Sequence, residues 1–126
     1  MTRTILLMAL AFATPAAAQT QTQTQMNVEA GAQWKTVDAA MTAQWKRSYA
    51  YMQGRDSHDR SRGGGFGYAP ALLNSQRAWL SFRDKQCVIE GAQFAGGSAQ
   101  PMARLQCLVR LTKERTVQLR NVMWQQ

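Results

Sequence analysis

The fold is decided by the stretch CVIEGAQFAGGSAQPMARLQC, residues 87–107, which begins and ends on the two cysteines of the chain. Gly96 and Gly97 lie at its middle, shortly before Pro101. Glycine readily adopts the left-handed conformation that ends a helix, and proline is tolerated in the first turn of the next helix. The stretch therefore predicts the turn of a helical hairpin.

The two cysteines, Cys87 and Cys107, predict a single disulfide bridge across this hairpin. They are equally distant from Gly97, so an antiparallel helical pair places them side by side. A bridge closing a loop of this length stabilises a fold by about 3 kcal/mol in the chain-entropy model. Two free buried thiols are the alternative. A metal site normally takes about four ligands, and His58 is the only histidine, so we expect no metal and no other cofactor.

The N-terminal sequence MTRTILLMALAFATPAAAQ predicts export. It has a basic residue at Arg3, an apolar run too short to cross a bilayer, and small residues at positions 16–18 that suit signal peptidase. We expect residues 1–18 to be removed by cleavage near Ala18, leaving a periplasmic or secreted protein with no transmembrane span. Residues 19–27 are polar and repetitive, and they predict a disordered tether.

Apolar side chains at helical spacing predict three helices and no strand. The first is expected over residues 28–53, the second over residues 71–94, and the third from about residue 100 to residue 124. We therefore expect one all-α domain over residues 28–126. It is a small, monomeric three-helix fold with an antiparallel C-terminal hairpin.

Charged residues occur on the inward sides of this hairpin and predict a buried polar network with a structural role. Its expected members are Arg83 and Glu90 in the second helix, and Arg104 and Arg115 in the third. An unpaired buried charge is costly, so each needs a partner. Positions at equal height across the hairpin pair Glu90 with Arg104.

Two further contacts follow from the same placement. Asp38 reaches the height of Arg83 if the first helix is antiparallel to the second, and Arg115 is expected to stack on Trp79 or to reach a carboxylate. The functional alternative is a pocket lined by Arg83, Glu90 and Arg115 that binds an anion or performs acid/base chemistry. Glu90 has no convincing catalytic companion there, so we predict no catalytic residue.

Residues 54–69 are rich in glycine and arginine, lack apolar periodicity, and predict a mobile loop. Long glycine-rich loops in small domains are often functional. Arg60, Arg62, Phe66 and Tyr68 therefore make this segment a candidate recognition loop. A tolerated insertion is the alternative interpretation.

The chain is strongly basic, with 15 Lys and Arg against 7 Asp and Glu and a formal net charge of +8. Such an excess favours acidic partners without naming one. Export argues against nucleic acid. Anionic envelope polymers, lipid headgroups and an acidic protein remain as candidate partners.

An ordered set of short motifs resembles the LprI-like lysozyme inhibitor family over about residues 71–120. The motifs are Ser75-Gln76-Arg77-Ala78-Trp79, Phe82-Arg83-Asp84, Cys87, Glu90, Gly96-Gly97-Ser98, Cys107, and Leu111-Thr112 with Arg115. The resemblance implies a small helical, disulfide-containing, exported domain, some of whose relatives inhibit lysozyme, and it assigns no catalytic residue. We therefore expect a binding protein and not an enzyme, with a lysozyme as the implied partner. The alternative is a basic envelope-binding module that holds anionic polymers or a partner protein.

Overall fold

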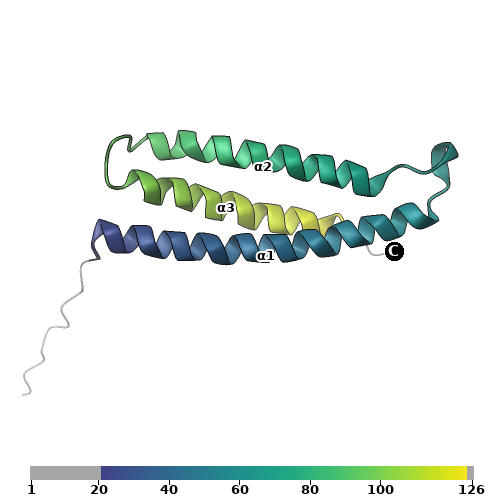
Figure 1. The fold of residues 1–126 in the computed structure, drawn as a ribbon, viewed down its shortest axis with the longest axis horizontal. Helices are drawn as coiled ribbons and strands as arrows, with labels where there is room; N and C mark the ends of the chain where they lie inside the picture. Colours follow the sequence, from purple (N-terminus) through teal and green to yellow (C-terminus); the bar gives the residue numbers. More distant parts are fainter. Residues whose placement is uncertain (1–20, 125–126) are drawn as a thin grey trace, which may run out of the picture.

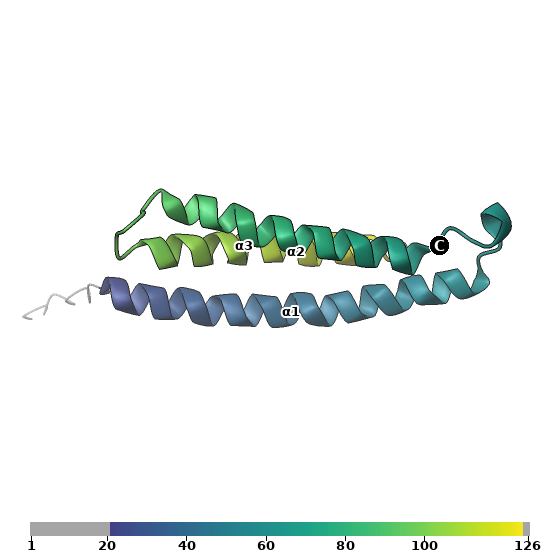
Figure 2. The same ribbon diagram turned by 45° about the horizontal axis from the view of Figure 1, so that its top comes forward.

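Three long helices make up almost all of the computed structural model, which describes residues 21–124. They are α1 (Gln23–His58), α2 (Tyr68–Ala92) and α3 (Gln100–Asn121), with a short 3-10 helix, η1 (Ser61–Gly63), between the first two. The helices lie side by side along the long axis of the molecule (Figure 1). Figure 2 shows α1 running along one side of the pair formed by α2 and α3. No strand occurs within residues 21–124.

Contacts between α1 and α3 show that these two helices are parallel. Near their starts, the Asn27 side chain donates a hydrogen bond to the Ser98 carbonyl at 3.2 Å. Towards their ends, the Ser48 hydroxyl donates to the Leu119 carbonyl at 2.6 Å, and Ser48 is fully buried. Helices α1 and α3 therefore run in the same direction. Helix α2, which lies between them in the sequence, runs in the opposite direction.

The hairpin between α2 and α3 has the predicted turn and the predicted bridge. Gly96 has a φ of +78°, and Pro101 lies in the first turn of α3. Cys87 and Cys107 form a disulfide with their Cα atoms 5.4 Å apart. The structure thus confirms the all-α, three-helix fold with an antiparallel C-terminal hairpin stapled by one disulfide.

Helix α1 extends further at its start than the sequence predicted. It begins at Gln23, because Thr22 and Gln25 form a capping box in which each side chain accepts the backbone N–H of the other residue. Residues 23–27 of the predicted tether are therefore helical. The predicted signal sequence and residues 19–20 lie outside the described residues.

Helix α1 also extends further at its end. The predicted loop was to begin at Gly54, but the helix continues through Gly54 to His58. A single glycine in a helix costs only about 1 kcal/mol, which other contacts offset here. The Ser57 hydroxyl donates to the Gly54 carbonyl at 2.7 Å, and the carboxylate of Asp56 binds the start of α2. The irregular segment is therefore shorter than predicted.

The buried apolar side chains form two clusters that Trp79 connects. One surrounds the disulfide and includes Leu108 and Leu111, and the other lies between the C-terminal half of α1 and the facing ends of α2 and α3. Within the part of the chain that the structure describes, no helix is long and apolar enough to cross a membrane.

Candidate functional site

Two buried arginines lie in the middle of the bundle, between tryptophan rings. The guanidinium carbon of Arg83 is 4.7 Å from the ring centre of Trp34 and 5.1 Å from that of Trp79. Arg83 is only 6% exposed, and it forms ion pairs with Asp38 at 3.2 Å and with Asp84 at 2.9 Å. We call Arg83, Arg115, Trp34 and Trp79 the central arginine layer. The Asp38 pair is the one that the sequence suggested.

Arg115 completes this layer from α3. Its guanidinium carbon lies 5.7 Å from the ring centre of Trp79, so it takes the stacked position that the sequence offered as one alternative. Its partners are neutral: its Nε donates to Gln76 at 2.9 Å, and its Nη2 donates to Ser75 at 3.0 Å. Burial lowers the pKa of Arg115 below the ordinary arginine value. The layer joins all three helices.

The predicted pair of Glu90 with Arg104 is wrong. Glu90 instead binds Arg110 through both carboxylate oxygens, at 2.8 and 2.9 Å; the Arg110 side chain is exposed and that of Glu90 is partly exposed. The backbone of Arg104 lies close to α2, because a Cβ at Gly91 would stand 3.1 Å from the Cβ of Arg104. Its own side chain is exposed. The buried network therefore contains Arg83 and Arg115 but not Glu90 or Arg104.

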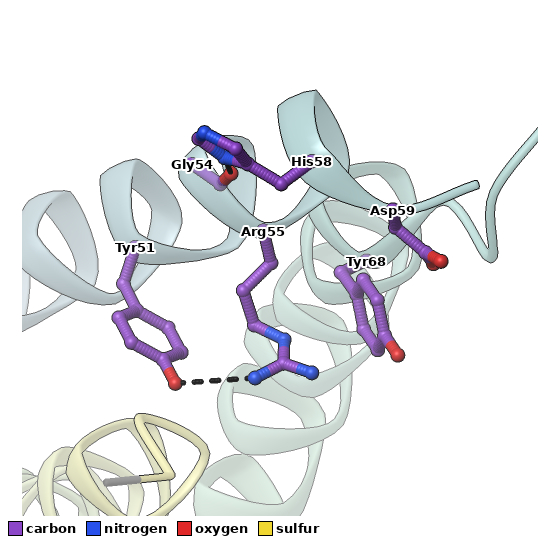
Figure 3. A pocket seen from close by; sticks show the side chains of 6 residues that line it. All are labelled: Tyr51, Gly54, Arg55, His58, Asp59 and Tyr68. Atoms are coloured by element: carbon purple, nitrogen blue, oxygen red, sulfur yellow. Dashed lines mark hydrogen bonds between the residues drawn. The ribbon is translucent and has the colours of Figure 1, made fainter. Parts of the chain in front are cut away.

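A cavity of about 550 Å³ opens at the other end of the bundle, where α1 ends and α2 begins. It is lined by Tyr51, Gly54, Arg55, His58, Asp59 and Tyr68. Figure 3 shows the guanidinium of Arg55 between the hydroxyl of Tyr51 and the ring of Tyr68, with the His58 ring on the far side, toward Gly54. We call this region the Arg55 pocket.

Aromatic side chains from three parts of the sequence hold the Arg55 guanidinium. Its central carbon is 4.9 Å from the ring centre of Tyr68 and 5.2 Å from that of Trp124. Its Nη1 donates to the Tyr51 hydroxyl at 3.4 Å, and that hydroxyl donates to the backbone carbonyl of Trp124. Hydrogen bonding to Tyr51, and then to Tyr68, raises the pKa of Arg55 above its ordinary value. The pocket therefore presents a permanent cation.

The carboxylates beside the pocket shape the chain around it. Asp56 accepts the backbone N–H groups of Tyr68 and Ala69, at 2.6 and 2.8 Å, and so caps the start of α2. Asp59 accepts the N–H groups of Ser61 and Phe66, at 2.8 and 2.9 Å, which lowers the pKa of Asp59. Both carboxylates are therefore engaged by the backbone.

The close return of the loop onto α1 requires glycine at one position. Gly65 has a φ of +98°, and a Cβ there would stand 3.0 Å from the carbonyl oxygen of Asp59. A larger residue would push the loop away from the end of α1. The glycine-rich composition that predicted a loop thus serves to fold it back toward the pocket.

The structure brings two of the four predicted recognition residues together. Phe66 packs on Tyr68 with ring centres 4.8 Å apart, and Tyr68 forms a wall of the Arg55 pocket. Arg60 is exposed and donates to the backbone carbonyls of Ser57 and Asp59. The backbone of Arg62 lies in η1, and its side chain is not among those described.

Sequence reasoning missed Tyr51, Arg55 and Trp124. Tyr51 and Arg55 lie close to residue 53, where the sequence predicted the end of the first helix, but α1 continues for five more residues. Trp124 is distant from both of them in the sequence. The only local signal is the spacing of Tyr51 and Arg55, which are four residues apart and so share a helix face. Among residues 21–124, no group of three His, Cys, Asp or Glu side chains is placed to hold a metal ion.

The sequence matches the protein family described as Lysozyme inhibitor LprI over residues 13–119. The chain belongs to this family. A curated relative, an uncharacterized protein of Rhizobium meliloti (strain 1021), is 33% identical over 99 residues, which cover 78% of this chain and 71% of the relative. No solved structure matches the chain. The LprI family match spans the central arginine layer, the disulfide and all six residues that line the Arg55 pocket, and it ends before Trp124.

Proposed function

We propose that this protein is an exported binding protein that inhibits a lysozyme. The observation that carries the proposal is the match to the Lysozyme inhibitor LprI family over residues 13–119. The family is named for inhibition and not for an enzymatic reaction. The single disulfide supports an exported protein, because such bridges persist in oxidising compartments.

The charge distribution supports a partner with an acidic surface. All seven carboxylates of the chain contact another residue of the chain, and they are Glu29, Asp38, Asp56, Asp59, Asp84, Glu90 and Glu114. Most of the basic side chains, in contrast, are exposed. Complementary charge speeds association and disfavours basic partners. We therefore propose a muramidase whose surface is acidic.

Inhibition is tested by titrating the mature protein into muramidases of acidic and of basic net charge. We expect saturable inhibition of an acidic enzyme, weaker at high ionic strength because salt screens exposed charges. Muramidases of basic net charge serve as the control, and we expect the protein to inhibit them less than the acidic ones. No inhibition of any muramidase at high micromolar protein would remove the proposal.

The net charge of +8 also favours a second candidate function, a basic module that binds anionic envelope polymers. Retention of the protein on isolated envelope fractions should then fall steeply as salt rises. Retention that does not change with ionic strength would contradict this candidate.

A further inference from the structure

We propose that the Arg55 pocket receives a carboxylate side chain of the partner protein. This assignment rests on the proposed function insofar as it takes the ligand to be a protein. The pocket can nevertheless be tested without that partner.

The guanidinium of Arg55 has more N–H donors than acceptors in its own chain. A guanidinium carries five N–H groups in a flat fork. Within residues 21–124 its acceptors are two tyrosine hydroxyls, that of Tyr51 at the long distance of 3.4 Å and that of Tyr68, and its buried Nε has no hydrogen-bond partner. No described carboxylate lies within ion-pairing distance of it, although Arg83 has two such partners. Two hydroxyl acceptors for five N–H groups leave donors of the guanidinium for an acceptor from outside the chain.

The carboxylates beside the pocket are not free to act as this acceptor. Asp56 and Asp59 are the acidic residues nearest in sequence, and each already accepts two backbone N–H groups. Turning either toward Arg55 would uncap α2 or release the loop. The cation is thus left for a ligand.

Aromatic rings hold the guanidinium of Arg55 in place before a ligand arrives. The rings of Tyr68 and Trp124 contact the guanidinium and limit its rotamers, which reduces the entropy lost on binding. Trp, Tyr and Arg are the residues that most often dominate the energy of protein interfaces. A carboxylate matches the planar fork with two parallel hydrogen bonds.

The surroundings favour a protein side chain over a free small anion. The cavity, about 550 Å³ and open to solvent, has room for a side chain and its neighbours. Trp124 is 50% exposed and Phe66 is 48% exposed beside it, so apolar contacts are available around the charged centre. Aromatic residues and arginine are both enriched at protein interfaces relative to the rest of the protein surface.

The pocket is tested directly by NMR titration of the full mature chain with two blocked tripeptides, acetyl-Ala-Glu-Ala-amide and acetyl-Ala-Gln-Ala-amide. We expect the Glu peptide, and not the Gln peptide, to shift the Trp124 indole and Arg55 Nε–H signals with saturation. Arg55→Gln should abolish these shifts. Arg104→Gln removes the same charge from an exposed site near the disulfide and should leave the shifts unchanged. Equal responses to both peptides, or binding of inorganic phosphate as tight as that of the Glu peptide, would overturn the assignment.

The second arm uses any muramidase that the protein inhibits. Arg55→Gln should weaken inhibition by at least about tenfold, because one charge-assisted pair is lost. Arg55→Lys, which keeps the charge and loses the fork, should fall between wild type and Arg55→Gln, and Arg104→Gln should change inhibition by less than about twofold. Full inhibition by a folded Arg55→Gln variant would overturn the pocket and leave the proposed function intact. Failure to inhibit any enzyme would remove the function, and the peptide titration would still decide the pocket.

Discussion

Two arginines in this bundle lie against aromatic rings, yet their surroundings differ. Arg83 is buried between Trp34 and Trp79, and two carboxylates of the same chain neutralise it. Arg55 lies against Tyr68 at the edge of an open cavity, and no described carboxylate pairs with it. In both regions, aromatic rings contact the guanidinium group and hold it in position. The location of the carboxylates distinguishes the two regions.

This difference separates structure from function within one small protein. A charge inside a fold must be compensated there, since removing a partner leaves a costly unpaired group. A charge at an open cavity can remain hydrated until a ligand arrives. Substitutions in the central arginine layer should therefore change stability, and substitutions in the Arg55 pocket should change binding.

The largest expected effect is the loss of the disulfide beside the central arginine layer. The double variant Cys87→Ala, Cys107→Ala should lower the free energy of unfolding by about 3 kcal/mol, because the bridge constrains a loop of 20 residues in the unfolded chain. Urea denaturation of the oxidised wild type and the variant measures the difference. Binding of the Glu peptide at the distant Arg55 pocket should persist while the variant is folded. An unchanged denaturation midpoint would show that the hairpin does not need its bridge.

The next effect concerns the two arginines themselves. Arg83→Met should lower the free energy of unfolding by about 2 kcal/mol, less than for a fully buried pair, because Asp38 and Asp84 are 40% and 56% exposed and can be hydrated. Arg55→Met is the matched control and should alter the melting temperature less, while it removes peptide binding. A greater loss of stability for Arg55→Met than for Arg83→Met would reverse the comparison.

The sequence predicted the central region better than the open end, for a physical reason. Helical periodicity turns Arg83 and Arg115 inward, and the equal spacing of the cysteines from Gly97 sets the hairpin register. These are properties of neighbouring positions on one helix or one hairpin. The Arg55 pocket instead joins Arg55 to Trp124, which local patterns do not connect.

Two of the errors at finer scale have separate causes. The end of α1 was placed too early because Gly54 and the polar residues after it carry no periodicity, whereas Asp56 holds the last turn through a contact with the start of α2. The predicted partner of Glu90 was wrong because the prediction paired residues at equal height, whereas long side chains also reach partners further along the axis. Arg110 is six residues beyond Arg104, about 9 Å along a helix, and two long side chains span that distance.

Acid should loosen the loop beside the Arg55 pocket, because Asp59 holds that loop through its carboxylate. Backbone N–H groups of Ser61 and Phe66 hold the pKa of Asp59 below its ordinary value. A carboxyl group with a lowered pKa stabilises the folded loop at neutral pH, and this contribution is lost as the pH falls below about 4, through the pKa of the folded state. The amide signals of Ser61 and Phe66, followed by NMR against pH, should report the change. In Asp59→Asn the same signals should lose this acid transition, and if they kept it, another group would be responsible.

The smallest effect is expected at Glu90, which offers a third setting for an arginine. Arg110 binds Glu90 on the surface, where the two side chains are 50% and 33% exposed, and exposed ion pairs contribute little because water and salt screen them. Glu90→Gln should therefore melt within error of wild type at neutral pH. Arg110, and then Gln86, lower the pKa of Glu90, so any contribution from the pair is present near neutrality and disappears in acid. A double-mutant cycle with Arg110→Gln isolates the coupling, and its salt dependence provides the control. A large coupling free energy between Glu90 and Arg110 that does not change with salt would show that this exposed pair stabilises the bundle, as Arg83 does. The exposed fraction of an arginine side chain would then no longer indicate whether that arginine stabilises the fold.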